Sequence, residues 1–168
     1  ILNYAVGAPQ VPIITDFLLN EGTINQTDAG WFYLEGSGAT NTISNTGDIT
    51  SLVFEVGSGT VNAASDLSVN AVLVSSGKLD MGSFNLTTAN GAQVSGGELD
   101  LGSGSWAVTG GNISISSSGS IDATGSILTL SGATEQTITS NGIALSKVVV
   151  NNSNGIKLID NMTISNTL

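Results

Sequence analysis

The sequence lacks cysteine, histidine and arginine, and it has only two prolines. Without histidine or cysteine the chain has neither the commonest general base nor a thiol nucleophile. A Ser–His–Asp triad and an imidazole or thiolate zinc site are excluded for the same reason. The absence of disulfides is compatible with the cytosol, and equally with an extracellular protein that has a large core. We therefore expect no enzyme activity, no catalytic residue and no cofactor, with calcium as the one ligand to consider.

Charge is also scarce and almost entirely of one sign. Charged residues make up 10% of the 168 residues, well below the share in a typical soluble domain, and the net charge is −10. The only basic side chains are Lys78, Lys147 and Lys157. Nucleic acids and anionic membrane surfaces attract clustered basic side chains, so neither is an expected partner. No long apolar run occurs, and membrane insertion is not expected either.

Small polar residues and glycine are what the sequence has in quantity. Serine, threonine and asparagine together number 57, and there are 22 glycines. Threonine fits the pleated surface of a sheet, whereas asparagine, serine and glycine fit turns. The long charged side chains that build a solvated helix face are almost missing. The composition therefore predicts an all-β protein.

A repeat is clear in the middle of the chain, where residues 74–93 read VSSGKLDMGSFNLTTANGAQ and residues 94–113 read VSGGELDLGSGSWAVTGGNI. A third copy follows with two residues inserted, which places Asp122 in the position of Asp100. In the same copy Leu128 falls in the position of Trp106. A fixed period of this length is typical of architectures built from stacked repeats. Eight of the twenty positions in the first two copies are identical, namely Val74/Val94, Ser75/Ser95, Gly77/Gly97, Leu79/Leu99, Asp80/Asp100, Gly82/Gly102, Ser83/Ser103 and Gly91/Gly111.

Within each repeat apolar side chains alternate with small polar ones, as in residues 99–101 and 113–115. Alternation over three to five residues, broken by pairs of glycine or serine, predicts short half-buried strands. The predicted fold is an all-β parallel β-helix, or β-solenoid, with coils of about 20 residues whose inward residues stack. Trp106 is expected in the core, in the column of Leu86. A sandwich of hairpins is the alternative, but its strands would not share a register of glycine and aspartate.

Stacking also predicts how the charged residues align. Lys78 and Glu98 share one repeat position, so they should lie one coil apart and attract each other. Asp80, Asp100 and Asp122 would form a column of like charges that needs either water or a bound cation. Carboxylate oxygens suit calcium, which makes these three aspartates candidate metal ligands. The alternative is that they face solvent and keep the rod soluble.

The phrase GxLDLGSxxxxVTGG at residues 97–111 and the tail TEQTITSNGIALSKVVVNNSNGIKLIDNMTISNTL carry a resemblance. They resemble the repetitive β-helical regions of large secreted, adhesin-like bacterial surface proteins, especially those of Bacteroidota. The resemblance extends from about Ile43 to Leu168 and brings no catalytic motif. It implies export across the outer membrane, display at the cell surface, and a role in adhesion, gliding or a filament sheath. Phage tail fibres and autotransporter-type passenger domains have similar coils.

Residues 1–22 differ in kind from the repeats. They contain both prolines and an apolar cluster that includes Phe17, Leu18 and Leu19. A solenoid end exposes unpaired strand edges and an open core, so we expect a cap, or a linker entering the first coil. The alternative is an assembly segment in which Phe17, Leu18 and Leu19 dock on a neighbouring subunit. The predicted division is a cap, linker or assembly segment at 1–22 and a β-solenoid at 23–168.

Three of the eight aromatic residues are consecutive, at Trp31, Phe32 and Tyr33. Strand alternation would place Trp31 and Tyr33 on one face and Phe32 on the other. One interpretation is an early coil packed against the N-terminal segment. The other is an exposed aromatic surface that stacks on sugars or contacts a protein.

Taken together, these features predict a structural or adhesive segment of an extracellular surface protein or filament, acting as a rigid rod or fibre subunit. The alternatives are a carbohydrate-binding or carbohydrate-processing β-helix and a subunit of phage tail-fibre type. Expected partners are other copies of the chain, neighbouring repeats of a longer chain, or surface glycans. Because the chain begins at Ile1 with no basic n-region and ends at Leu168 in mid-pattern, we expect it to be a piece of a longer protein.

Overall fold

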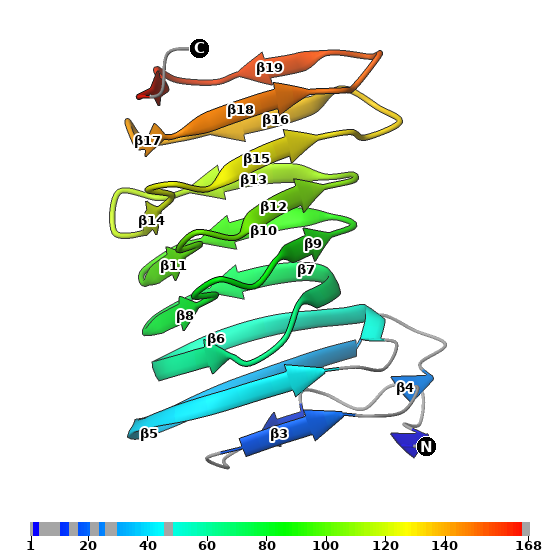
Figure 1. Cartoon of the computed structure of the whole chain (residues 1–168), viewed down its shortest axis with the longest axis vertical. Coiled ribbons are helices and arrows are strands. Elements are labelled where there is room, and N and C mark those ends of the chain that lie inside the picture. The colour runs from blue at the N-terminus through cyan, green and yellow to red at the C-terminus, as the bar shows by residue number, and fades with distance from the viewer. Residues whose placement is uncertain are drawn as a thin grey trace.

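The computed structural model describes residues 2–3, 11–13, 17–20, 24–25, 30–45 and 49–165. These residues form strands, turns and bends, and the strands pair in parallel and stack one above another (Figure 1). The predicted fold class, an all-β parallel β-solenoid, is confirmed. Within the described ranges no helix has the length and hydrophobicity needed to cross a bilayer.

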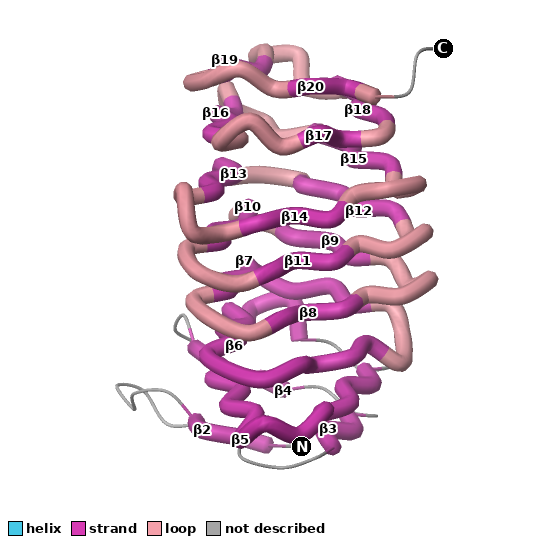
Figure 2. Tube along the Cα trace, turned by 90° about the vertical axis from the view of Figure 1, so that its left-hand side faces the viewer, coloured by secondary structure: helices cyan, strands magenta, loops and turns pink. Residues whose placement is uncertain are grey.

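From Lys78 onward each coil contributes one strand to each of three sides of the stack (Figure 2). The β12 face holds β9 (Leu86–Thr88), β12 (Ser105–Val108), β15 (Ile127–Leu130) and β18 (Lys147–Val150). The β13 face holds β10 (Gly91–Val94), β13 (Asn112–Ile115), β16 (Gln136–Thr139) and β19 (Ile156–Leu158). The β11 face holds β8 (Lys78–Asp80), β11 (Glu98–Asp100) and β14 (Ser120–Asp122). On the same side of the stack, β17 (Ala144–Leu145) and β20 (Thr163–Ile164) pair with each other in a separate sheet (Figure 2).

Nearer the N-terminus, longer strands run along two faces without an intervening turn. β6 (Ile49–Ala63) pairs first with β7 (Leu67–Val74) and then with β8, and β5 (Gly30–Asn45) stacks beneath β6. Short parallel strands lie beneath β5, and they are β2 (Val11–Ile13) and β3 (Phe17–Asn20). β1 (Leu2–Asn3) pairs with β4 (Ile24–Asn25). The described strands of residues 1–22 that pair with β5 thus continue the parallel stack.

The register between coils is the one that the repeat predicts. Leu79 pairs with Leu99, its equivalent in the next copy, and Leu99 pairs with Ile121 across the two inserted residues. Leu128 stacks on Trp106, as the third copy of the repeat requires. On the β13 face one column of paired residues passes through six coils, at Phe54, Val72, Ala92, Ile113, Ile138 and Leu158.

The core is formed by the inward residue of each alternating pair, and apolar side chains from all three faces meet there. Trp106 is completely buried, which confirms its predicted place in the core. Its indole Nε1–H donates a hydrogen bond of 3.2 Å to the hydroxyl of Thr88, one coil away. In the described part of the chain no buried side-chain nitrogen or oxygen lacks a partner. Alternation and pairing therefore close the interior without an unsatisfied polar atom.

The glycine that follows Asp80-Met81 and Asp100-Leu101 in the first two copies has a structural cause. Gly82 and Gly102 occupy the same position in successive coils, and both have a positive φ, of 58° and 50°. Side chains disfavour this left-handed region. At Gly102 an added Cβ would also overlap the carbonyl oxygen of Gly82, because the two corners stack in backbone contact. At Gly82 an added Cβ would meet nothing within 4 Å.

These two glycines form a matched pair for measurement. Gly82→Ala adds only the left-handed strain and should lower the free energy of unfolding by about 1–2 kcal/mol. Gly102→Ala adds the same strain and an overlap with the neighbouring corner, so it should lower that free energy at least about twice as much. Urea unfolding followed by circular dichroism measures both. Equal losses would contradict the close stacking of corners.

Candidate functional site: the charged column and the open last coil

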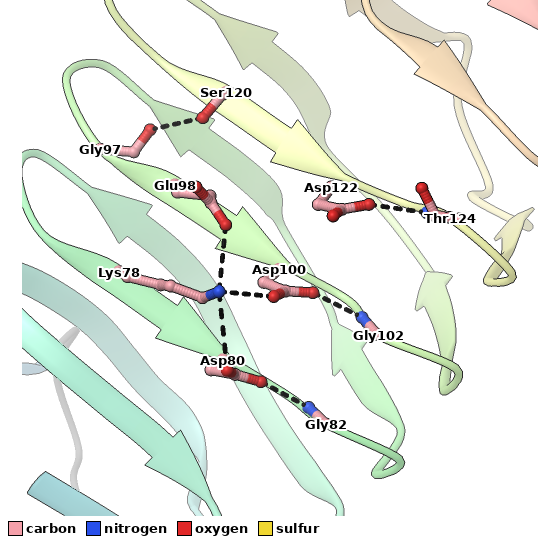
Figure 3. Close-up of polar contacts among 10 residues, drawn as sticks. All are labelled: Lys78, Asp80, Gly82, Gly97, Glu98, Asp100, Gly102, Ser120, Asp122 and Thr124. Carbon is pink, nitrogen blue, oxygen red and sulfur yellow. Dashed lines mark hydrogen bonds and ion pairs between the residues drawn. The ribbon is translucent and has the colours of Figure 1, made fainter. Parts of the chain in front are cut away.

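The three repeated aspartates lie side by side on the β11 face, where β8, β11 and β14 bring them into register (Figure 3). The Oδ1 atom of each accepts a hydrogen bond of 2.9 Å from the backbone N–H two residues further on. The three pairs are Asp80 with Gly82, Asp100 with Gly102, and Asp122 with Thr124. This local bond is an Asx turn, which shapes a corner. The aspartate therefore repeats because each corner uses it.

Lys78 places a positive charge among these carboxylates (Figure 3). Its Nζ lies 2.6 Å from Asp100 Oδ2, 3.1 Å from Glu98 Oε1 and 3.6 Å from Asp80 Oδ2. The predicted pairing of Lys78 with Glu98 across adjacent coils is confirmed, although Asp100 is nearer. Hydrogen bonding to Asp100, and secondarily to Glu98, raises the pKa of Lys78 above its ordinary value. The column of like charges is thus neutralised in part by a lysine of the chain itself.

The prediction of calcium at Asp80, Asp100 and Asp122 stays a prediction. Across the described residues no group of three or more acidic, histidine or cysteine side chains is placed to hold a metal ion. Asp122 has its own local partner, and the backbone N–H of Thr124 holds the pKa of its carboxyl below the usual range. A calcium ion in this column would have to compete with the ammonium group of Lys78.

Removing the ammonium tests its role. In Lys78→Met the carboxylates would face one another unscreened, so the free energy of unfolding should fall by about 1 kcal/mol at low ionic strength. The loss should shrink in about 1 M salt, where the screening length falls to about 3 Å. Lys157→Met is the control, because Lys157 is exposed and makes no ion pair in the described part of the chain. A loss independent of salt would contradict an electrostatic role for Lys78.

The β11 face is interrupted after β14, since β17 pairs with β20 and not with β14. An open pocket of about 340 Å³ lies at this interruption. It offers two carboxylates and two hydroxyls, but none of the described residues that line it is aromatic, so it lacks the ring-lined walls typical of small-molecule sites. The lining residues are Glu98, Ser120, Ile121, Asp122, Ala123, Thr124, Ile143 and Ala144.

The last coil, made of β18, β19 and β20, presents the other notable surface. Among the described residues, each of its strands pairs on one side only, with β15, β16 and β17 respectively. All the exposed large hydrophobic residues of the described part of the chain lie in this coil, at Val149, Val150, Leu158, Ile159 and Ile164. They are exposed because no further coil lies above them among the described residues.

Two polar side chains fix the last coil to the coil before it. The carboxylate of Asp160 accepts hydrogen bonds from Ser140 N at 2.7 Å, from Ser140 Oγ at 2.8 Å and from Asn141 N at 2.6 Å. The backbone N–H of Ser140 is the main cause that holds the pKa of Asp160 below its ordinary value. Asn152 Nδ2 donates to Thr134 O at 2.7 Å and to Gln136 Oε1 at 3.0 Å. These hydrogen bonds connect the last coil to the coil below.

The Asp160 contacts predict a pH dependence. Because the folded-state pKa is lowered, the stability that Asp160 contributes is present above the unfolded pKa of 3.8 and is lost as the pH falls through the folded pKa. Wild type should therefore be more stable than Asp160→Asn at neutral pH, and the difference should close in acid. Thermal unfolding at a series of pH values measures it. Glu135→Gln, which removes an exposed carboxylate from the coil below, serves as the control substitution.

Two further sets of predicted residues are placed by their backbone alone. Trp31, Phe32 and Tyr33 lie in β5, opposite Val53, Phe54 and Glu55 of β6. Phe17, Leu18 and Leu19 lie in β3, paired with Thr42, Ile43 and Ser44 of β5. The side chains of both sets lie outside the described part. The aromatic binding surface and the assembly contact therefore stay predictions.

Sequence reasoning missed the exposed residues of the last coil. Part of the signal was present, since Val148, Val150 and Leu158 follow the same inward alternation as earlier coils. An inward position is buried only where coils lie on both sides of it, and the alternation does not say which coils have two neighbours.

The chain matches no protein-family model, no curated protein and no solved structure. The resemblance to adhesin-like surface proteins thus depends on the residue pattern and the periodicity of the sequence alone. The fold and its surfaces define the class: a parallel β-solenoid with a column of aspartates that Lys78 neutralises in part.

Proposed function

We propose that this chain is a rigid structural or adhesive segment of an extracellular surface protein or filament. The observation that carries the proposal is the parallel ladder between coils, which runs along the β12 face from β7 to β18 and along the β13 face from β6 to β19. In such a ladder the hydrogen bonds point along the axis of the stack, at a spacing of about 4.8 Å per coil. Bending the stack would require many of these bonds to lengthen together, so the rod resists it.

The core supports the same function. Inside the stack an inward side chain contacts the coils on both sides, as Leu99 does between Leu79 and Ile121. In a solenoid the stability is close to a sum of contacts between neighbouring repeats. Coils can therefore be added to a rod without a change in those already present, which suits a spacer of variable length.

The outer surface suits contact with water and with other surfaces. Along the β12 face the outward positions hold Thr87, Ala107 and Thr129, which stack in one column. Small uncharged side chains of this kind keep a rod soluble without strong repulsion between rods. The extracellular location is supported by the resemblance of the sequence to secreted surface proteins.

Electron microscopy of the protein in its native source tests this function. An antibody against the central coils should label intact, unpermeabilised cells, and the label should follow thin rods or fibres at the surface. Labelling that appears only after permeabilisation would contradict the extracellular location. Label on compact particles with no rod would contradict the structural role.

A further inference from the structure

The ladder of the β11 face is interrupted at a point that has coils on both sides. Among the described strands, β14 pairs only with β11 below it, and β17, on the same side of the next coil, pairs only with β20 (Figure 2). β14 and β17 lie further apart than strands that pair. The two coils meet again directly after the gap, where Gly125 N donates a hydrogen bond of 2.8 Å to Ser146 Oγ. The gap is therefore confined to the length of one strand.

A shorter path across this side of the stack causes the gap. The coil that contains β14 runs from Ile113 to Leu128, and the residues paired with these two in the next coil are Ile138 and Val148. The crossing in the next coil is thus five residues shorter. The shortened coil does not reach outward over β14, and one edge of β14 stays uncovered inside the stack.

The uncovered edge of β14 offers backbone groups for pairing. The N–H of Ser120 and the carbonyl oxygen of Asp122 form hydrogen bonds with the coil below. In a parallel ladder the residue between two such residues faces the other way. Ile121 is only 8% exposed, and its N–H and C=O have no partner among the described residues. An unpaired edge of this kind is a template for one more strand.

The pocket in the gap has room for one strand and not for a second sheet. Its volume is about 340 Å³, near the lower end of the range for ligand sites. β14 and Thr124 form one wall, and Ile143 and Ala144 of the next coil form the other. Because both walls belong to the stack, another solenoid cannot lay the edge of its sheet against β14. The occupant has to be a single extended segment.

The side chains around the gap specify the pattern of such a segment. Successive side chains of a strand point to opposite faces, so a residue paired with Ile121 would point inward and its two neighbours outward. The inward side of the pocket is lined by the apolar side chains of Ile121 and Ile143. The outward side carries Glu98, Ser120 and Asp122 (Figure 3). The segment should therefore place an apolar residue between two residues that face carboxylates.

Charge favours basic residues at the two outward positions. Lys78 forms ion pairs with three carboxylates of β8 and β11, but none of the described ion pairs includes Asp122. The backbone N–H of Thr124 holds the pKa of Asp122 below its usual range, so this carboxylate is charged at neutral pH. The whole chain has a net charge of −10, which attracts a basic partner from a distance.

We propose that the gap between β14 and β17 binds an extended segment of a partner protein with a basic–apolar–basic pattern, such as Lys-Val-Lys, as one added strand. The apolar side chain packs on Ile121, and a basic side chain lies beside Asp122. In strand addition the main-chain hydrogen bonds supply affinity, and the alternate side chains supply specificity. This binding site goes beyond the role of a rod and does not depend on where the rod is located.

Nuclear magnetic resonance of the intact chain tests the site with a blocked peptide, Ser-Lys-Val-Lys-Ser. Without peptide, the Ile121 amide should exchange with solvent faster than that of Leu99, its paired residue, whose strand has partners on both edges. With peptide, the amide signals of residues 120–124 should shift most, and exchange at Ile121 should slow.

Two aspartates at the same repeat position give matched variants. Asp122→Asn removes the charge at the gap and keeps an oxygen that accepts the hydrogen bond from Thr124 N. It should weaken peptide binding about threefold or more. Asp80→Asn makes the same change two coils below the gap and should leave binding nearly unchanged. Equal melting temperatures of the two variants would confirm that both are folded.

Several results would overturn the site. They are the absence of shifts at any peptide concentration, exchange at Ile121 that does not slow in the complex, equal weakening by both variants, and equal affinity for a Glu-Val-Glu peptide of the same design. The same shifts on concentrating the chain alone, or on adding a neutral oligosaccharide, would assign the gap to a second copy or to a glycan and overturn the basic partner. None of these results bears on the rod, which is tested by its appearance at the cell surface.

Discussion

The backbones of successive coils lie at the spacing of paired strands around most of the circumference, at the corners as well as on the faces. On the faces, hydrogen bonds impose this spacing. At the corners it leaves no room for a side chain between Gly102 and the carbonyl oxygen of Gly82. Since each coil must repeat the path of the one below, the same residue types return at the same positions. The period and the columns are consequences of this one distance, and so is the lack of room for a side chain at Gly102.

The same spacing decides where charge is tolerated. A column of aspartates would repel itself, yet the Asx turn at each corner draws one carboxylate oxygen toward the backbone. Lys78 then lies among the remaining oxygens of Asp80, Asp100 and Glu98. The primary role of the repeated aspartate in this solenoid is thus structural, because its side chain forms the Asx turn at each corner. An ion site has to be demonstrated separately, through ligands that the corner does not already use.

The features that could be predicted from sequence are those that repeat. The pairing of Leu79 with Leu99, the contact of Lys78 with Glu98 and the burial of Trp106 all follow from the period of the repeat and the strand alternation within it. The shorter distance from Lys78 to Asp100 could not be predicted. It depends on the conformation of the lysine side chain, which reaches past its paired residue Glu98 to Asp100, two residues further along the neighbouring strand. The interruption after β14 could not be predicted either, because it arises in a coil whose length departs from the period.

The coil between Ile113 and Ile138 is longer than the repeat, and its additional residues lie at the surface. Ile113 and Ile138 lie further apart along the chain than one period of the repeat and still pair in register, so the additional residues are carried by the corners. At the corner before β16, Gln136 is buried and its Oε1 accepts a hydrogen bond of 2.9 Å from Gly132 N. Its Nε2 donates to the backbone oxygens of Val108 and Gly111, each at 3.3 Å. Ala133, Thr134 and Glu135 project outside this anchor and are exposed. A foreign peptide grafted at this corner would be displayed at a fixed height on the rod, as long as the backbone oxygens of Ala133 and Thr134 keep the hydrogen bonds they accept from Asn154 and Asn152 of the next coil.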